Sequence, residues 1–126
     1  MFSPKAAFSG FSVDDIDKAK EFYTGVLGLK AEEQMSGLRI ELPAGGETWV
    51  YPKEDHKPAA YTMLNLVVDD IDAAVDALAE KGVEFEKYEG FHQDDKGIAR
   101  GKAANMGPDI AWFKDPAGNI LSVLAN

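Results

Sequence analysis

The sequence contains no cysteine and only two histidines, which restricts the chemistry available to it. Without cysteine there is no disulfide framework, no thiolate metal site, no thiol nucleophile and no cysteine-based redox switch. No apolar run approaches the roughly 20 residues that a membrane-spanning helix needs. The apolar stretch near the N-terminus, Ala6 to Phe8, is too short for a secretory signal, so we expect a cytoplasmic protein.

Basic residues are scarce relative to acidic ones. The chain has 13 Lys and Arg against 22 Asp and Glu, which gives a formal net charge of −9 at pH 7. This surplus of negative charge repels phosphate backbones and anionic lipid surfaces, so we expect neither a nucleic-acid nor a membrane partner. A single domain over residues 1–126 is large enough to be stable without disulfides or a structural metal.

The clearest positive feature is an internal repeat. Val13–Ala19 reads V-D-D-I-D-K-A and Val68–Ala74 reads V-D-D-I-D-A-A, at an offset of 55 residues (68 − 13 = 55). In each copy a short apolar run precedes the string, and an amphipathic stretch that ends at a glycine follows it. Two copies are too few for a solenoid, so the repeat predicts two similar modules, about residues 1–55 and 60–126, that pack on each other.

Each copy of the repeated string marks a predicted junction between a strand and a helix. Asp14 and Asp15, like Asp69 and Asp70, can accept hydrogen bonds from the free amides at a helix start, and their charge suits the positive end of the helix dipole. Apolar residues then recur at spacings of three and four. This spacing predicts a helix of about three turns in each module.

The residues after each helix change to the alternating pattern of β-strands. Each module is therefore predicted as strand, helix and three strands, and the fold class as α+β. The strands placed by the pattern are Leu38–Leu42, Thr48–Tyr51, Glu84–Tyr88, Asp109–Lys114 and Asn119–Leu124. The polar segment between Glu89 and Pro108 is too long for a simple connection, and we interpret it as either a functional lid or a mobile loop.

Two strings carry a resemblance to a known superfamily. Glu21–Leu29 reads E-F-Y-T-G-V-L-G-L, and Trp112–Leu121 reads W-F-K-D-P-A-G-N-I-L. With the duplicated module they resemble the vicinal oxygen chelate superfamily, which includes glyoxalase I, extradiol dioxygenases, fosfomycin-modifying enzymes and bleomycin-resistance proteins. The resemblance implies two tandem βαβββ modules that form a curved mixed sheet around a cup-shaped pocket. It also implies a homodimer.

The resemblance locates the positions of metal ligands in this chain. Catalytic members typically hold a divalent metal with a histidine from the first strand of each module and a glutamate from the last strand of each. This sequence has Phe8 and Met63 where the histidines are expected and Ser122 in place of the second glutamate. The first glutamate matches Val50 or, with a one-residue shift, Tyr51. None of these side chains is a good ligand for such an ion, so no metal or other cofactor is expected.

The two histidines lie outside these positions. His56 falls in a charged linker and His92 in the long polar segment, and we interpret both as loop histidines. Two enzymatic alternatives stay open. One is a metal-dependent lyase, isomerase or dioxygenase of the same superfamily that recruits non-standard ligands such as Glu41, Glu47, His56 or His92. The other is a metal-free enzyme in which His92 or Tyr51 transfers a proton.

Replacement of the ligands by large, soft side chains favours a binding protein for a small, partly aromatic organic molecule. The expected ligand-binding residues are Phe8, Tyr51, Met63, His92, Arg100, Trp112 and Ser122. Arg100 or His92 would meet an anionic or carbonyl-bearing ligand if the long segment closes as a lid. Strand aromatics can equally belong to the core. If Val50 occupies the cup, Trp49 and Tyr51 face the helices instead.

Overall fold

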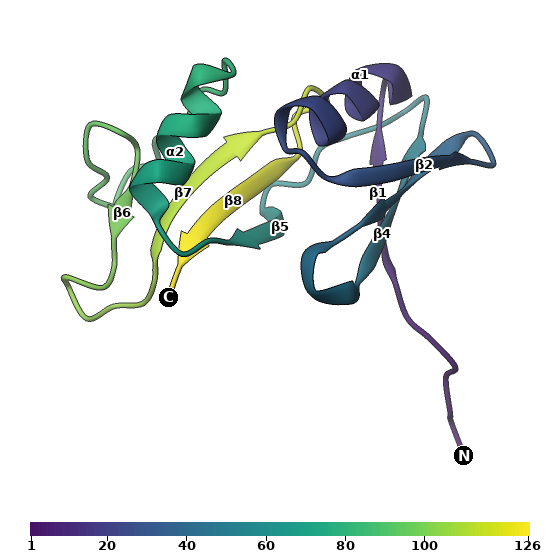
Figure 1. Cartoon of the computed structure of the whole chain (residues 1–126), viewed down its shortest axis with the longest axis horizontal. Coiled ribbons are helices and arrows are strands. Elements are labelled where there is room, and N and C mark those ends of the chain that lie inside the picture. The colour runs from purple at the N-terminus through teal and green to yellow at the C-terminus, as the bar shows by residue number, and fades with distance from the viewer. The chain divides into compact units, whose positions relative to one another are not determined.

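The computed structural model describes the whole chain, residues 1–126, as two compact units. The first unit is Met1–Pro58 and the second is Ala59–Asn126 (Figure 1). Each unit has a four-stranded sheet, a helix and a core of its own. Neither helix has the length and apolar character needed to cross a membrane.

The first unit follows the order strand, helix and three strands. In its sheet, ordered β1-β4-β3-β2, β1 runs parallel to β4 and the other neighbours are antiparallel. The elements are β1 (Ser9–Val13), α1 (Ile16–Lys20), η1 (Glu21–Val26), β2 (Lys30–Gln34), β3 (Gly37–Glu41), η2 (Pro43–Gly45) and β4 (Glu47–Pro52). Since η1 follows α1 directly, the two form one helix that changes from α to π geometry.

The second unit repeats this topology. Its sheet has the order β5-β8-β7-β6, with β5 parallel to β8 and the other neighbours antiparallel. The elements are β5 (Thr62–Val67), α2 (Ile71–Glu80), β6 (Ala99–Arg100), β7 (Asp109–Lys114) and β8 (Ile120–Ala125). The predicted α+β class and the duplicated strand-helix-three-strand module are confirmed.

The aspartates of the repeated string start both helices as predicted. The Asp15 carboxylate accepts hydrogen bonds from the amides of Asp17 and Lys18, both at 3.1 Å. Asp70 accepts one from the amide of Ala73, also at 3.1 Å. Such caps satisfy amides that have no partner inside the helix, and each contributes about 1 kcal/mol.

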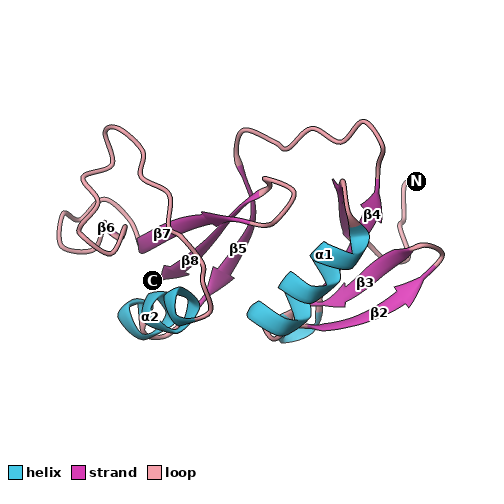
Figure 2. Ribbon diagram, turned by 90° about the horizontal axis from the view of Figure 1, so that it is seen from above, coloured by secondary structure: helices cyan, strands magenta, loops and turns pink.

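Each sheet packs one face against its own helix (Figure 2). In the first unit Leu38, Ile40 and Val50 are fully buried on that face, beneath the fully buried ring of Tyr23. In the second unit Phe113 is fully buried on the corresponding face. Removing a side chain of this size from water contributes about 1.5–3 kcal/mol, so each unit is stabilised mainly by the layer between its sheet and helix.

One predicted strand is wrong. The segment Glu84–Tyr88 forms only a single bridge, Phe85 to Phe113, and the short strand β6 lies instead within the long polar segment. The reason is the side chain of Gln93. Its amide nitrogen donates to the carbonyls of Glu86 and Gly97, both at 2.7 Å, and its oxygen accepts from the Tyr88 amide at 2.7 Å. These bonds occupy backbone groups that a sheet ladder would otherwise use.

Candidate functional site

The face of each sheet opposite its helix, which we call the open face, carries the candidate binding residues. In the first unit Val50 pairs with Phe11 and Leu38 and is fully buried on the helix side. Neighbouring side chains of a strand point to opposite faces, so Trp49 and Tyr51 lie on the open face. This arrangement favours Tyr51, which is 37% exposed, over Val50 as the residue at the metal-ligand position of that strand.

The first open face borders a pocket of about 300 Å³. Its apolar wall is formed by Phe8, Met35 and Trp49, and its polar side includes Arg39. Phe8 is 66% exposed and lies just before β1, so of the residues predicted for the site it is the one found in this pocket. The pocket therefore combines an aromatic surface with a charged group.

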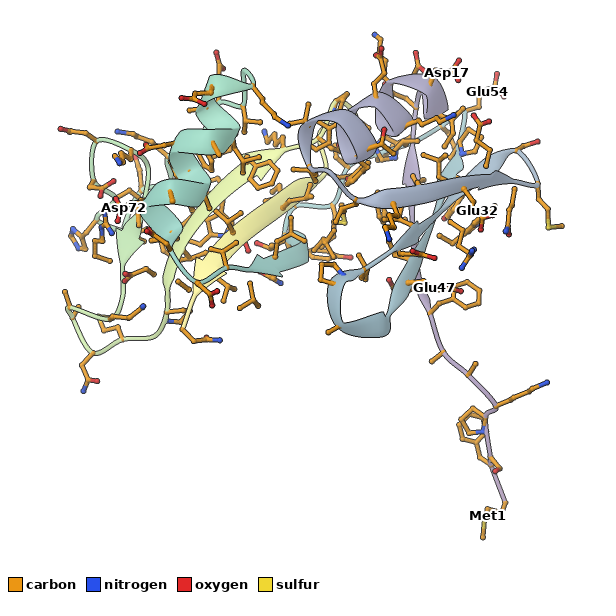
Figure 3. The ribbon with its side chains drawn as sticks, in the orientation of Figure 1. Met1, Asp17, Glu32, Glu47, Glu54 and Asp72 are labelled. Atoms are coloured by element: carbon orange, nitrogen blue, oxygen red, sulfur yellow. The ribbon has the colours of Figure 1, made fainter.

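The charge in this pocket is already neutralised by neighbours. The Arg39 guanidinium donates to the Glu47 carboxylate at 2.8 Å and also to the Glu32 carboxylate. Glu32 and Glu47 are labelled in Figure 3. These two hydrogen bonds raise the pKa of Arg39 above its usual range. Since two carboxylates surround one guanidinium, this group is a poor partner for an anionic ligand.

The position of the Trp49 indole depends on a glycine in the neighbouring strand. A Cβ atom on Gly37 would lie 2.6 Å from Trp49 Cζ2 and 2.6 Å from the carbonyl oxygen of Val50. Real Cβ contacts are essentially never this short. The absent side chain lets the indole lie directly against β3, so Gly37 sets where the ring stands in the first open face.

The second open face has a row of polar and aromatic side chains across three strands. Ser122 of β8 pairs with Asn65 of β5 and with Trp112 of β7. The Ser122 hydroxyl is buried and donates to the Asn65 side-chain oxygen at 2.6 Å. Met63 lies where the β5–β8 register shifts and is half-buried. The hydroxyl hydrogen of Ser122 is therefore already engaged by a residue of the neighbouring strand β5.

A second pocket, of about 350 Å³, lies on this open face, and we call it the aromatic pocket. Its lining includes Tyr61, Thr62, Tyr88, Phe91, Trp112 and Ile120. The rings of Phe91 and Trp112 are 5.0 Å apart between centroids, and those of Tyr88 and Trp112 are 5.5 Å apart. Both pairs are tilted edge to face, the arrangement that aromatic rings prefer. Trp112 is 8% exposed and forms the floor shared by the other two rings.

Tyr88 has the least usual environment in the aromatic pocket. Its hydroxyl is buried and has no hydrogen-bond partner. Burial raises the pKa of Tyr88, and the charge of Glu86 adds to this effect. The Tyr88 backbone is fixed because its amide donates to Gln93 at 2.7 Å. The Tyr88 side chain therefore places an uncharged hydroxyl group without a hydrogen-bond partner at a fixed position among aromatic rings.

The polar segment after the aromatic pocket is tied to helix α2 by ion pairs. Arg100 donates two hydrogen bonds to the Asp72 carboxylate, at 2.8 and 3.0 Å, and one to Asp94 at 3.0 Å. Asp72 is labelled in Figure 3. Lys96 lies 3.4 Å from Asp72 and 3.0 Å from Asp76. Hydrogen bonding to Arg100 lowers the pKa of Asp72 to about 2. Arg100 is thus engaged with α2 and does not line the aromatic pocket.

Within the second unit, the aromatic pocket contains only some of the predicted site residues. Trp112 lines the aromatic pocket, whereas His92 is exposed in the turn that follows Phe91, with a left-handed backbone at φ 48°. The linker histidine, His56, is within 2.6 Å of the Ser12 hydroxyl through its Nδ1 atom. No pattern in the sequence marks Tyr88 as a site residue, because its place among the rings depends on the Gln93 side chain.

The donor set does not fit the divalent metal of the catalytic relatives. The matching positions hold a phenyl ring, a thioether, a phenol and the Ser122 hydroxyl, which is engaged with Asn65. Within each unit, no group of three or more His, Asp or Glu side chains stands close enough to hold an ion. Among the non-standard candidates, Glu47 is paired with Arg39 and His56 is in contact with Ser12.

The sequence and the fold agree with one protein family. Residues 7–123 match the model of the Glyoxalase/Bleomycin resistance protein/Dioxygenase superfamily. This match covers nearly the whole chain, so the protein belongs to that superfamily, and the resemblance found in the sequence is confirmed. The comparison with curated protein sequences gave no match.

Solved structures show the same fold. An integron cassette protein from the mobile metagenome of the Halifax Harbour sewage outfall has a TM-score of 0.70 at 21% identity, covering 98% of this chain and 100% of that one. An antibiotic-binding protein from a Streptomyces species has 0.66 at 21%, covering 98% of both chains. A fosfomycin resistance protein from Listeria monocytogenes has 0.70 at 15%, covering 100% of this chain and 95% of that one.

Proposed function

We propose that this protein binds a small, partly aromatic organic molecule in the aromatic pocket without using a divalent metal. The observation that carries the proposal is the set of three rings, Tyr88, Phe91 and Trp112, around a pocket on the open face of the second unit. The positions that hold metal ligands in catalytic relatives carry side chains that bind such ions poorly, which supports binding over metal-dependent catalysis.

The physical basis is the burial of apolar surface. Pockets for small molecules are mostly apolar and contain a few polar groups that orient the ligand. A volume of about 350 Å³ suits a molecule of one or two rings. Edge-to-face contacts with aromatic side chains add about 0.5–1.5 kcal/mol per pair beyond the buried area. The antibiotic-binding protein of the same fold supports a binding function in this structural class.

The proposal is tested by screening the intact protein for ligands in the presence of a chelator. A library of one- and two-ring aromatic compounds is added in EDTA, and the melting temperature is measured. A compound that binds the native state raises Tm in proportion to its saturation. We expect hits that persist in EDTA and that are lost in Trp112→Ala.

The matched control for this screen is Trp49→Ala, which removes the other tryptophan of the chain. Trp49 belongs to the first unit and lines its separate pocket. Hits that survive Trp112→Ala but are lost in Trp49→Ala would move the site to the first open face. Hits that need added metal would contradict the metal-free proposal.

We also propose a cytoplasmic homodimer, following the superfamily resemblance. The supporting observation is the number of large apolar side chains that stand exposed, including Phe2, Phe8, Tyr61 and Val67. Sedimentation equilibrium is expected to give twice the mass of 13.7 kDa, and a monomer at high concentration would contradict the dimer.

A further inference from the structure

We propose that the Phe91 ring is a movable wall of the aromatic pocket, which an aromatic ring of the ligand pushes aside, and that the Tyr88 hydroxyl then donates to an acceptor on that ligand. The inference rests on the proposed function and deepens it. It assigns the ligand class as a ring that bears a carbonyl or another hydrogen-bond acceptor. Phe91 and Tyr88 become the residues that set this specificity.

The first step of the argument is the free Tyr88 hydroxyl. It is buried without a partner, although buried hydroxyl groups in proteins are normally hydrogen-bonded. Leaving such a donor unsatisfied carries a free-energy penalty in the ligand-free protein. A bound molecule that supplies an acceptor removes the penalty, whereas one of the same shape without an acceptor does not. The pocket should therefore bind a ligand that carries a hydrogen-bond acceptor more tightly than a ligand of the same shape that lacks one.

The second step is the position of Phe91. Its ring contacts both other rings, 5.0 Å from Trp112 and 6.3 Å from Tyr88 between centroids. It is nevertheless 52% exposed, whereas Trp112 is 8% exposed. Phe91 therefore lies on the outer side of the aromatic cluster. Moving its ring away would expose less buried surface than moving the ring of Trp112.

The third step is the backbone that carries Phe91. Gly90 before it has φ 88° and His92 after it has φ 48°, so both neighbours are in the left-handed region. That region is sparsely populated by residues other than glycine, and His92 is strained there. The turn has no regular secondary structure, while Gln93 fixes the chain directly behind it through three hydrogen bonds. Phe91 can therefore move without disturbing Tyr88.

The test uses two probes with the same arrangement of heavy atoms, acetophenone and α-methylstyrene, of which only the first has a carbonyl acceptor. Binding to the full chain is measured by titration in two-dimensional ¹H–¹⁵N NMR. For the wild-type protein we expect acetophenone to bind about threefold to tenfold more tightly, the range that one neutral hydrogen bond supplies. In Tyr88→Phe the ratio should fall to about one while α-methylstyrene still binds.

The second variant, Phe91→Ala, removes the proposed movable wall. Both probes should bind more tightly, because the binding-competent state no longer has to be reached by moving the ring. The ratio between the probes should stay as in the wild type. Phe2→Ala is the matched control, since it truncates an exposed phenylalanine in the N-terminal segment, far in the sequence from the pocket.

The outcomes separate the two proposals. An unchanged probe ratio in Tyr88→Phe, or weaker binding of both probes to Phe91→Ala, overturns the inference and leaves the binding function intact. Absence of binding to the wild type and to Phe91→Ala, with dispersed spectra that show both are folded, overturns the function and the inference together. A lower Tm for ligand-free Tyr88→Phe would also contradict the inference, because loss of an unsatisfied hydroxyl should not destabilise the protein.

Discussion

Replacing Gly37 by alanine tests whether the first open face is built by close contact between β3 and the Trp49 indole. The new Cβ would stand 2.6 Å from Trp49 Cζ2 and 2.6 Å from the Val50 carbonyl oxygen. Carbon atoms in contact normally lie about 3.5–4.0 Å apart, so both neighbours must shift by about 1 Å. Overpacking of this kind costs about 1–3 kcal/mol. We therefore expect Gly37→Ala to lower the free energy of unfolding by that amount.

The assay is urea denaturation followed by tryptophan fluorescence and circular dichroism. If unfolding is followed by heating instead of urea, each kcal/mol of lost stability corresponds at this chain length to a fall in Tm of about 3–5 °C. Two comparisons isolate the cause. Gly10→Ala places a Cβ no closer than 3.4 Å to any atom outside its immediate neighbours and should be nearly neutral. Trp49→Ala in the Gly37→Ala background should recover part of the loss, because only the contact with the Val50 carbonyl remains.

The reasoning would be refuted by an unchanged unfolding midpoint in Gly37→Ala. It would equally fail if Gly10→Ala and Gly37→Ala destabilised the protein to the same extent. In that case the loss would reflect a general effect of alanine at strand glycines. A coupling energy near zero between positions 37 and 49 would show that the indole is not the group displaced.

Three further predictions concern the second unit. The pKa of Asp72 lies near 2 in the folded protein against an ordinary value of 3.8, so its stabilising effect is complete above about pH 4 and is lost as pH falls through 2. Acid titration of Asp72→Asn should therefore show a shallower loss of stability between these values. Arg100→Ala removes the two hydrogen bonds to Asp72 of α2 and the bond to Asp94, and amide exchange at residues 93–98 should accelerate while the exchange of β8 does not change. Asp115→Ala removes three hydrogen bonds of the β7–β8 turn, to Ala117 and Asn119, and should cost about 1–3 kcal/mol in urea denaturation.

The parts of the fold that could be predicted from the sequence are those set by short-range chemistry. Asp15 and Asp70 cap helices because a carboxylate two or three residues before a free amide reaches it in almost any context. The Asp115 turn follows the same logic, since its partners lie within four residues along the chain. The duplication could be recognised in the sequence because both modules retain this capping pattern.

The parts that could not be predicted depend on contacts between distant residues. Glu84–Tyr88 has the composition of a strand, but a side chain five residues further along the chain takes its backbone hydrogen bonds. Arg100 was expected to face a ligand and is held by Asp72, 28 residues earlier in the chain. Nothing in the sequence next to Glu84–Tyr88 or next to Arg100 shows these partners.

The same limit applies to the face that each strand aromatic occupies. Alternation shows that Trp49 and Val50 point to opposite sides, but only the burial of Val50 against the helix decides which side is open. Tyr88 is a stronger case, because its unpaired hydroxyl is a property of the folded aromatic pocket. Sequence periodicity carries no information on whether a hydroxyl finds a partner.

The independence of the two cores has a consequence for how this protein can change over generations. Since each helix packs on its own sheet, a substitution on one open face lies outside the layer between sheet and helix of the other half. One half here presents a guanidinium between two carboxylates, and the other presents a cluster of rings. Duplication thus supplies two surfaces on which natural selection can act separately, and adaptation to a new compound can begin in one half while the other is retained.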